Sequence, residues 1–335
     1  MIRLLIAEDS ATVRKHLTSL FSREPDFEVV GTVGSADEVA SAVERYQPDA
    51  LSLDVYMPGR AAVEVVREVL STRPLPIILV SDAPRHDAEV FEALSAGALD
   101  FVGKPLASDD EACRELVHLF RALSRVRVRV RRRKAAQPAP PRPSEIRLVT
   151  IVSSTGGPTA LRELLASLGS GFSVPVVVAQ HLAVGFEEGL ARWLAQATSL
   201  RIRVAQSGDS LEPGEVLLGQ AGNDLVIEPT GRVRIARPEE RGYHPSGDVL
   251  FSSAASAYGS GVLGAVLSGI GSDGAKGAAS IAAAGGILMA QDDQSSAVYG
   301  MPKAVAHLAL FIGSPAKMAA SIVEAVSSRG APRAR

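Results

Sequence analysis

The chain has 335 residues, of which 46% are hydrophobic and 21% are charged, with a formal net charge of −2 at pH 7. This is an ordinary globular composition, with apolar material for about two domain cores. The single cysteine, Cys113, excludes an internal disulfide and a cysteine-based metal site and fits a reducing cytosol. Acidic residues follow Met1 too closely for a signal peptide, and Gly and Ser break the longest uncharged stretch. We therefore expect a cytoplasmic protein without membrane insertion.

Charge is distributed unevenly along the chain. Residues 1–120 carry 11 Lys/Arg and 21 Asp/Glu, residues 121–147 carry 10 and 1, and residues 148–335 carry 14 and 15. The basic run Arg125–Lys134 and the proline-rich stretch Gln137–Pro143 predict a semi-rigid linker over residues 123–145. A basic run can also bind nucleic acid, but no recognition helix or aromatic platform accompanies it. We therefore expect no nucleic-acid partner.

The N-terminal domain, predicted over residues 1–122, alternates apolar runs with amphipathic stretches. The apolar runs, each predicted as a buried strand, are Arg3–Ala7, Glu28–Val33, Ala50–Leu53, Ile77–Val80 and Asp100–Val102. The helical stretches between them are Ala11–Phe21, Ala36–Tyr46, Ala62–Leu70 and Ala88–Leu94. Five β/α units predict one right-handed parallel sheet covered by helices, a flavodoxin-like (βα)5 fold.

Polar residues follow the strands at the carboxyl edge of this predicted sheet. Glu8 and Asp9 follow the first strand and Asp54 follows the third, so the three carboxylates are expected to converge. Such a cluster is repulsive unless a cation is bound, and all-oxygen ligation suits Mg²⁺. Ser81 and Lys104 follow the fourth and fifth strands and would add a hydroxyl and an ammonium group. These groups suit a phosphoryl group on a carboxylate.

These residues make the first 120 positions resemble a response-regulator receiver domain. The matching segments are Glu8–Ser10, Leu53–Pro58 and Gly97–Pro105. The resemblance implies that Asp54 accepts phosphate from a histidine kinase, with Glu8, Asp9 and Asp54 holding Mg²⁺. The chain departs from the family at Gly59–Ala62, where Asp-Gly usually follows Met-Pro. The loop beside the pocket is therefore expected to move differently.

The C-terminal domain, predicted over residues 146–328, resumes the β/α alternation. Its predicted strands are Arg147–Val152, Pro175–Gln180, Val262–Ser268 and Ile287–Ala290. Its predicted helices are Thr159–Leu168, Phe186–Ala195, Val249–Tyr258 and Ala275–Ala284, followed by helices to the end. Two further runs, Leu225–Glu228 and Arg232–Ala236, predict a hairpin around Pro229–Gly231. The pattern predicts a doubly wound, mostly parallel α/β domain with a β-hairpin.

Three motifs of this domain directly follow predicted strands. The segment Ser153–Pro158 leads into a helix, where free N–H groups could stabilise an oxyanion beside a serine. A serine at such a junction is also a common N-cap, so the segment alone does not indicate a nucleophile. His181, the one histidine of six placed at a strand end, and Asp273 follow two other strands. A hydroxyl, a base and an orienting acid can thus meet at one sheet edge.

A dinucleotide-binding loop is a competing interpretation of the third motif. Gly269, Gly271 and Gly274 match the G-x-G-x-x-G fingerprint, and Asp292 ends the next strand. Only about 60 residues follow, too few for a full dinucleotide domain. An aspartate inside the loop would also repel a pyrophosphate. The glycines are better explained as a tight turn that presents Asp273.

The motifs together resemble the catalytic domain of the chemotaxis protein-glutamate methylesterase (CheB) family, from about Arg147 to Val326. The matching segments are Ser154–Gly157, Gln180-His181, Gly271–Ala275, Pro245–Phe251 and Tyr299–Pro302. Ser154, not Ser153, occupies the position before Thr-Gly-Gly. The family commonly has methionine in the third loop, where this chain has Ile270.

The resemblance implies hydrolysis of γ-glutamyl methyl esters on the cytoplasmic helices of methyl-accepting chemoreceptors, with release of methanol, and deamidation of receptor glutamines. Ser154 would be the nucleophile, His181 the base and Asp273 the orienting acid, with backbone N–H groups near Thr155 and Ile270 holding the oxyanion. No cofactor is expected for the esterase. We also expect the receiver domain to regulate it, the unphosphorylated receiver covering the catalytic groove. The alternatives left open are a regulator whose second domain only binds DNA or protein and, after it, a dinucleotide-binding enzyme.

Overall fold

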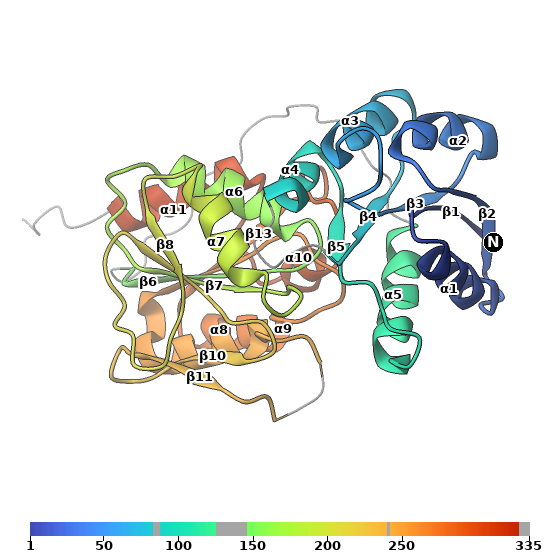
Figure 1. Ribbon diagram of the computed structural model, residues 1–335. Coiled ribbons are helices and arrows are strands. Elements are labelled where there is room, and N and C mark those ends of the chain that lie inside the picture. Colours follow the sequence, from blue (N-terminus) through green and yellow to red (C-terminus); the bar gives the residue numbers. More distant parts are fainter. Residues whose placement is uncertain (83–87, 125–145, 240–241, 328–335) are drawn as a thin grey trace, which may run out of the picture. The chain divides into compact units, whose positions relative to one another are not determined.

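The computed structural model describes residues 1–82, 88–124, 146–239 and 242–327. The chain divides into two compact units, residues 1–130 and 131–335, each described by itself here (Figure 1). From residue 125 onward the predicted linker lies outside the described residues. The predicted domain limits at 122 and 146 stay a prediction.

The first unit is built on a five-stranded parallel sheet with strand order β2-β1-β3-β4-β5. The strands are β1 (Ile2–Ala7), β2 (Phe27–Val33), β3 (Ala50–Leu53), β4 (Ile77–Val80) and β5 (Asp100–Val102). The helices are α1 (Ala11–Ser22), α2 (Val39–Tyr46), α3 (Ala62–Thr72), α4 (Ala88–Ala96) and α5 (Asp110–Leu123), with a 3₁₀ turn over Ala36–Glu38 before α2. The predicted strands are confirmed to within one residue at each end.

Helices cover both faces of this sheet, which explains the continuous apolar strands. Helices α1 and α5 lie on one face, and α2, α3 and α4 lie on the other (Figure 1). Every residue of β3 and β4 is consequently buried. Beneath α1 and α5 the ring of Phe21 packs 5.1 Å from that of Phe27 and 5.2 Å from that of Phe120. This aromatic cluster anchors the two helices to the sheet.

The second unit contains a seven-stranded parallel sheet with strand order β14-β13-β12-β6-β7-β9-β8. The strands are β6 (Leu148–Ser153), β7 (Val176–Gln180), β8 (Arg201–Val204), β9 (Glu215–Leu218), β12 (Val262–Val266), β13 (Ile287–Gln291) and β14 (Phe311–Gly313). The helices are α6 (Gly157–Leu168), α7 (Glu187–Ala195), α8 (Gly247–Tyr258), α9 (Ala275–Ala283), α10 (Met301–Val305) and α11 (Pro315–Ser327), with a 3₁₀ turn over Gly259–Gly261. The doubly wound fold is confirmed: α6, α7 and α11 cover one face, and α8 and α9 the other (Figure 1).

Three strands of this sheet were missed by the sequence analysis. Strands β8 and β9 extend one side of the sheet, and β14 interrupts the segment predicted as helices only. Each has three or four residues, too few for a periodic pattern to stand out. Strand β9 also carries Glu215, which is buried and paired with Arg203 at 2.6 Å. That partner comes from β8 and is visible only in three dimensions.

The predicted hairpin forms a separate antiparallel sheet of β10 (Asp224–Ile227) and β11 (Val233–Ala236). It packs beside α8, where the Ile227 N–H donates to the Ser253 hydroxyl at 3.1 Å. Strand β6 is the switch point of the main sheet, because the chain goes from it to β7 on one side and later to β12 on the other. The carboxyl ends of these three strands therefore meet, the usual location of a site in such a sheet.

Candidate active site and phosphoacceptor site

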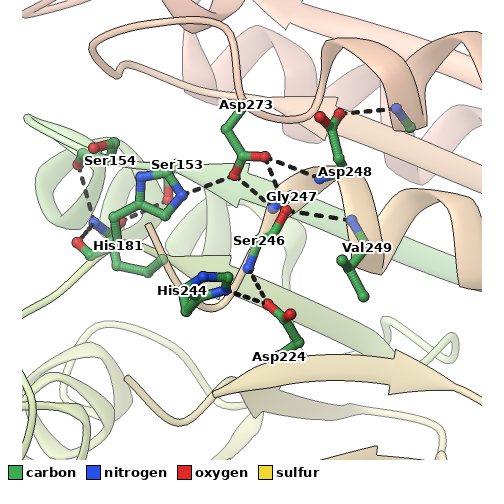
Figure 2. Close-up of polar contacts among 12 residues, drawn as sticks. Ser153, Ser154, His181, Asp224, His244, Ser246, Gly247, Asp248, Val249 and Asp273 are labelled. Atoms are coloured by element: carbon green, nitrogen blue, oxygen red, sulfur yellow. Dashed lines mark hydrogen bonds and ion pairs between the residues drawn. The ribbon is translucent and has the colours of Figure 1, made fainter. Parts of the chain in front are cut away.

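His181 and Asp273 form a hydrogen bond at this switch point (Figure 2). The Nε2 atom of His181 lies 2.9 Å from Oδ2 of Asp273. The two side chains are 5% and 19% exposed, respectively, so the contact is largely shielded from water. Within the described part of the chain, the buried Nδ1 atom of His181 has no hydrogen-bond partner.

Asp273 also lies against the N-terminus of α8 (Figure 2). Its Oδ2 accepts a bond from the Gly247 N–H at 2.6 Å, and its Oδ1 accepts from the Asp248 N–H at 3.1 Å and the Ser246 hydroxyl at 3.0 Å. Burial raises the pKa of Asp273, but the hydrogen bonds from His181 and the helix amides outweigh it and hold the pKa below its usual value. An ionised carboxylate requires Nε2 of His181 to carry the hydrogen. In the neutral imidazole with this tautomer, Nδ1 carries the lone pair and is the nitrogen that can accept a proton.

Ser154 lies beside His181, at the end of the neighbouring strand (Figure 2). The register pairs Ser153 with Gln180, so Ser154 and His181 are the next residues of two adjacent parallel segments. The backbone N–H of His181 also donates to the backbone carbonyl of Ser153 at 3.0 Å. Ser154 is 8% exposed, and its hydroxyl makes no hydrogen bond to any described residue. The structure thus joins His181 to Asp273 and places Ser154 next to them without a bond to the imidazole.

Ser153 has a different environment. It is fully buried, and its hydroxyl donates to Oε1 of Gln180 at 2.6 Å. The Gln180 amide in turn donates to the carbonyls of Ser154 at 3.0 Å and His181 at 2.7 Å. The hydrogen bonds of Ser153 and Gln180 therefore connect the two strand ends, whereas the hydroxyl of Ser154 takes no part in these bonds.

The third loop presents Asp273 through a glycine turn. Gly271 and Gly274 adopt φ values of 83° and 87°, which favour glycine. The Ser154 N–H donates to the Ser268 carbonyl at 3.0 Å, so this loop is fixed to the end of β6. Because the side chain of Asp273 turns to α8 and His181, the glycines serve this aspartate rather than a bound dinucleotide. The predicted oxyanion positions, Thr155 and Ile270, lie on the first and third loops.

Several contacts of the site were missed by sequence reasoning. The segment Pro245–Phe251 matched the family, but no role was assigned to it. The sequence signal was an N-cap serine followed by an acidic residue at the start of a helix. The aromatic ring of Tyr243 stacks on the imidazole of His181, with 5.1 Å between the ring centroids and 14° between the planes. A tyrosine in a loop gives no such indication by itself.

The first unit brings its five predicted polar residues together at the carboxyl edge of its sheet. The Lys104 ammonium lies 2.9 Å from Oδ2 of Asp54 and 2.9 Å from Oε2 of Glu8. The Ser81 hydroxyl donates to Oδ1 of Asp54 at 2.6 Å. Glu8 and Asp54 are buried, and Asp9 is exposed. One ligand oxygen from each of these three carboxylates lies within 4.8 Å of the others.

The electrostatics of this cluster fit a cation. Burial raises the pKa of Glu8. The hydrogen bond from Lys104 lowers this pKa and the negative charge of Asp54 raises it, and the pKa stays above its ordinary value. Burial lowers the pKa of Lys104, but hydrogen bonds to Asp54 and Glu8 outweigh it and raise that pKa. Lys104 thus neutralises only part of the acidic charge. The Lys104 ammonium forms an ion pair with Glu8, and the three carboxylates together form an all-oxygen donor set of the kind that fits Mg²⁺.

Comparison with known proteins assigns both units. The family model for CheB methylesterase matches residues 149–322, and that for the response regulator receiver domain matches residues 4–115. This chain belongs to the CheB methylesterase family. The resemblances found in the sequence are therefore confirmed for both the receiver domain and the CheB catalytic domain.

Curated CheB relatives cover nearly the whole chain. A Myxococcus xanthus protein named protein-glutamate methylesterase/protein-glutamine glutaminase 3 is 39% identical over 310 residues, covering 90% of this chain and 87% of the relative. A protein of the same name from Anaeromyxobacter dehalogenans is 40% identical over 319 residues, covering 91% and 92%. The crystal structure of the Thermotoga maritima CheB methylesterase catalytic domain matches with TM-score 0.52 and 30% identity, covering 54% of this chain and 99% of that one. None of the described helices has the length and hydropathy that a membrane span requires.

Proposed function

We propose that this CheB family member hydrolyses γ-glutamyl methyl esters on methyl-accepting chemoreceptors, releasing methanol, and deamidates receptor glutamines. The observation that carries the proposal is the environment of His181. Its Nε2 bonds Asp273, its Nδ1 has no hydrogen-bond partner among the described residues, and Ser154 lies next to it on the adjacent strand end. The names of the curated relatives support the same substrate class.

In the proposed reaction, Oγ of Ser154 attacks the ester carbonyl carbon while Nδ1 of His181 takes the hydroxyl proton. Asp273 stabilises the imidazolium that results. Backbone N–H groups near Thr155 and Ile270 hold the tetrahedral oxyanion until the C–O bond breaks and methanol leaves with the proton from Nδ1. Water then attacks the acyl-enzyme by the same route and restores the serine. With a glutamine substrate, ammonia leaves in place of methanol.

The choice of nucleophile is tested with two neighbouring serines. We expect Ser154→Ala to lower kcat for methanol release by about 10³-fold or more, because it removes the attacking oxygen. We expect Ser153→Ala to retain activity within about tenfold, because that hydroxyl bonds Gln180 rather than substrate. Both full-length variants are assayed on methylated receptor membranes, and thermal unfolding measures their folded fraction. The opposite ranking of kcat would contradict the assignment of Ser154.

For the first unit, we propose that Asp54 accepts phosphate from a histidine kinase in the cytoplasm and that this raises esterase activity. Glu8, Asp9 and Asp54 would hold Mg²⁺, which supplies positive charge to the phosphoryl oxygens when bound. The Lys104 ammonium, already 2.9 Å from Asp54, would pair with a phosphoryl oxygen. The Ser81 hydroxyl, which now donates to Asp54, would donate to another. We propose no nucleic-acid partner and no membrane insertion.

A further inference from the structure

A second His–Asp pair lies next to the catalytic residues (Figure 2). Nδ1 of His244 lies 2.7 Å from Oδ1 of Asp224, and their side chains are 13% and 8% exposed. Asp224 is the first residue of β10, and the same Oδ1 accepts the Ser246 N–H at 2.9 Å. The His244 carbonyl accepts the Gly222 N–H at 3.1 Å. Residues 244–246 are thus fixed to the start of the hairpin by three hydrogen bonds.

This fixed segment and its two chain neighbours, Tyr243 and Gly247, contact both members of the catalytic dyad. On one side of His244, the Tyr243 ring stacks on the His181 imidazole. On the other side, the Ser246 hydroxyl and the Gly247 N–H donate to the two carboxylate oxygens of Asp273. The position of His244 therefore determines both the stacking surface for the base and the donors that keep the orienting acid ionised.

We propose that Asp224 and His244 form a positioning pair for the reaction, an inference that rests on the proposed esterase function. Among the described residues, neither member of the pair hydrogen-bonds the Ser154 hydroxyl or the His181 imidazole. It acts through Tyr243, which limits rotation of the His181 ring, and through Ser246, which orients the start of α8 toward Asp273. Loss of the pair leaves the base free to turn its Nδ1 away from Ser154. Misplacement of a catalytic group by about 1 Å can lower a rate by about 10²-fold.

Three single variants of the full-length chain test the pair. His244→Ala removes the donor to Asp224, whereas His244→Asn keeps an N–H donor at the same distance from the backbone. His307→Ala is the matched control, because His307 is exposed and takes no part in the hydrogen bonds of this network. We expect His244→Ala to lower kcat for methanol release by about 10-fold to 100-fold with KM changed less than about threefold. His244→Asn should recover kcat to within about threefold of the wild type, and His307→Ala should match it.

A spectroscopic measurement separates positioning from mere stability. The Nε2 proton of His181, held by Asp273, should give a sharp downfield NMR signal in the wild type and in His244→Asn. We expect this signal to broaden in His244→Ala at temperatures where thermal unfolding shows the variant to be folded. If His244→Ala keeps both the signal and the wild-type kcat, the proposal is wrong. It is equally wrong if His244→Asn loses as much kcat as His244→Ala.

The design distinguishes this inference from the proposed function. If the wild type releases no methanol from methylated receptors, the esterase assignment fails, and the NMR signal still shows whether His244 orders His181. Only the positioning pair is refuted if the wild type and His244→Ala are both fully active while Ser154→Ala is inactive.

Discussion

At the scale of single residues, the protonation of Asp273 decides which imidazole nitrogen can act as the base. Four hydrogen bonds converge on this carboxylate, and three of them come from the first residues of α8 and its cap. We expect Asp273→Asn to lower kcat for methanol release by about 10³-fold to 10⁴-fold. An asparagine amide that donates to Nε2 moves the hydrogen of His181 to Nδ1 and removes the base. Steady-state assays beside Ser154→Ala test this, and a wild-type kcat in Asp273→Asn would refute the role of the acid.

The same residue predicts a dependence of stability on pH. Because the pKa of Asp273 is lowered on folding, its stabilising contribution is complete above its unfolded pKa of about 3.9. The contribution is lost as the pH falls through the folded value. Urea unfolding of the wild type and Asp273→Asn from pH 7 down to pH 2 measures this contribution as the difference between their free energies of unfolding. The two free energies of unfolding should converge below pH 4, and a constant difference would show that the charge does not contribute.

At the scale of secondary-structure elements, the first turn of α6 fixes the two strand ends that carry Ser154 and His181. A Cβ atom on Gly157 would overlap Oε1 of Gln180 and lie 2.8 Å from Cβ of Ser153. Helix propensity alone predicts that Gly157→Ala stabilises the protein by about 1 kcal/mol. We expect the contact to dominate and the variant to lose about 1–3 kcal/mol of unfolding free energy.

A glycine in open space provides the comparison for this prediction. A Cβ atom on Gly171 would meet no atom within 4 Å, so Gly171→Ala should change stability by less than about 0.5 kcal/mol. Urea denaturation of both variants tests the pair. A stable Gly157→Ala protein with unchanged methanol release would show that Gln180 can move without affecting the site.

At the scale of the whole molecule, a phosphoacceptor unit and an esterase unit belong to one chain. We expect acetyl phosphate with Mg²⁺ to increase methanol release by the wild type several-fold, and Asp54→Asn to abolish this response, because the acceptor oxygen is gone. The measured quantity is the ratio of rates with and without the donor. Ser154→Ala should still take up phosphate while releasing no methanol. An equal response in Asp54→Asn would disprove the coupling.

The placement of many residues in both candidate sites could be predicted from the ends of the predicted strands. Asp54, Ser81 and Lys104 were found because each directly follows a buried apolar run, and parallel strands bring their carboxyl ends together. His181 and Asp273 were found in the same way. Tyr243 and His244 were not, because they lie in a loop between the hairpin and α8, where no periodicity indicates which side chains meet.

The sequence by itself determined the first sheet, the four central strands of the second, their parallel winding and the loops that carry the candidate site residues, since apolar runs and motifs are local properties of the chain. Only the tertiary structure decided that the amides of α8 donate to the carboxylate of Asp273 and that the hydroxyl of Ser153 donates to Gln180. It also decided that Asp224 fixes the segment beside His181. It also decided that Glu215 can be buried within β9. These contacts join residues between 12 and 27 positions apart. Hydrogen-bond partners at such separations are set by packing geometry, which local sequence pattern does not encode.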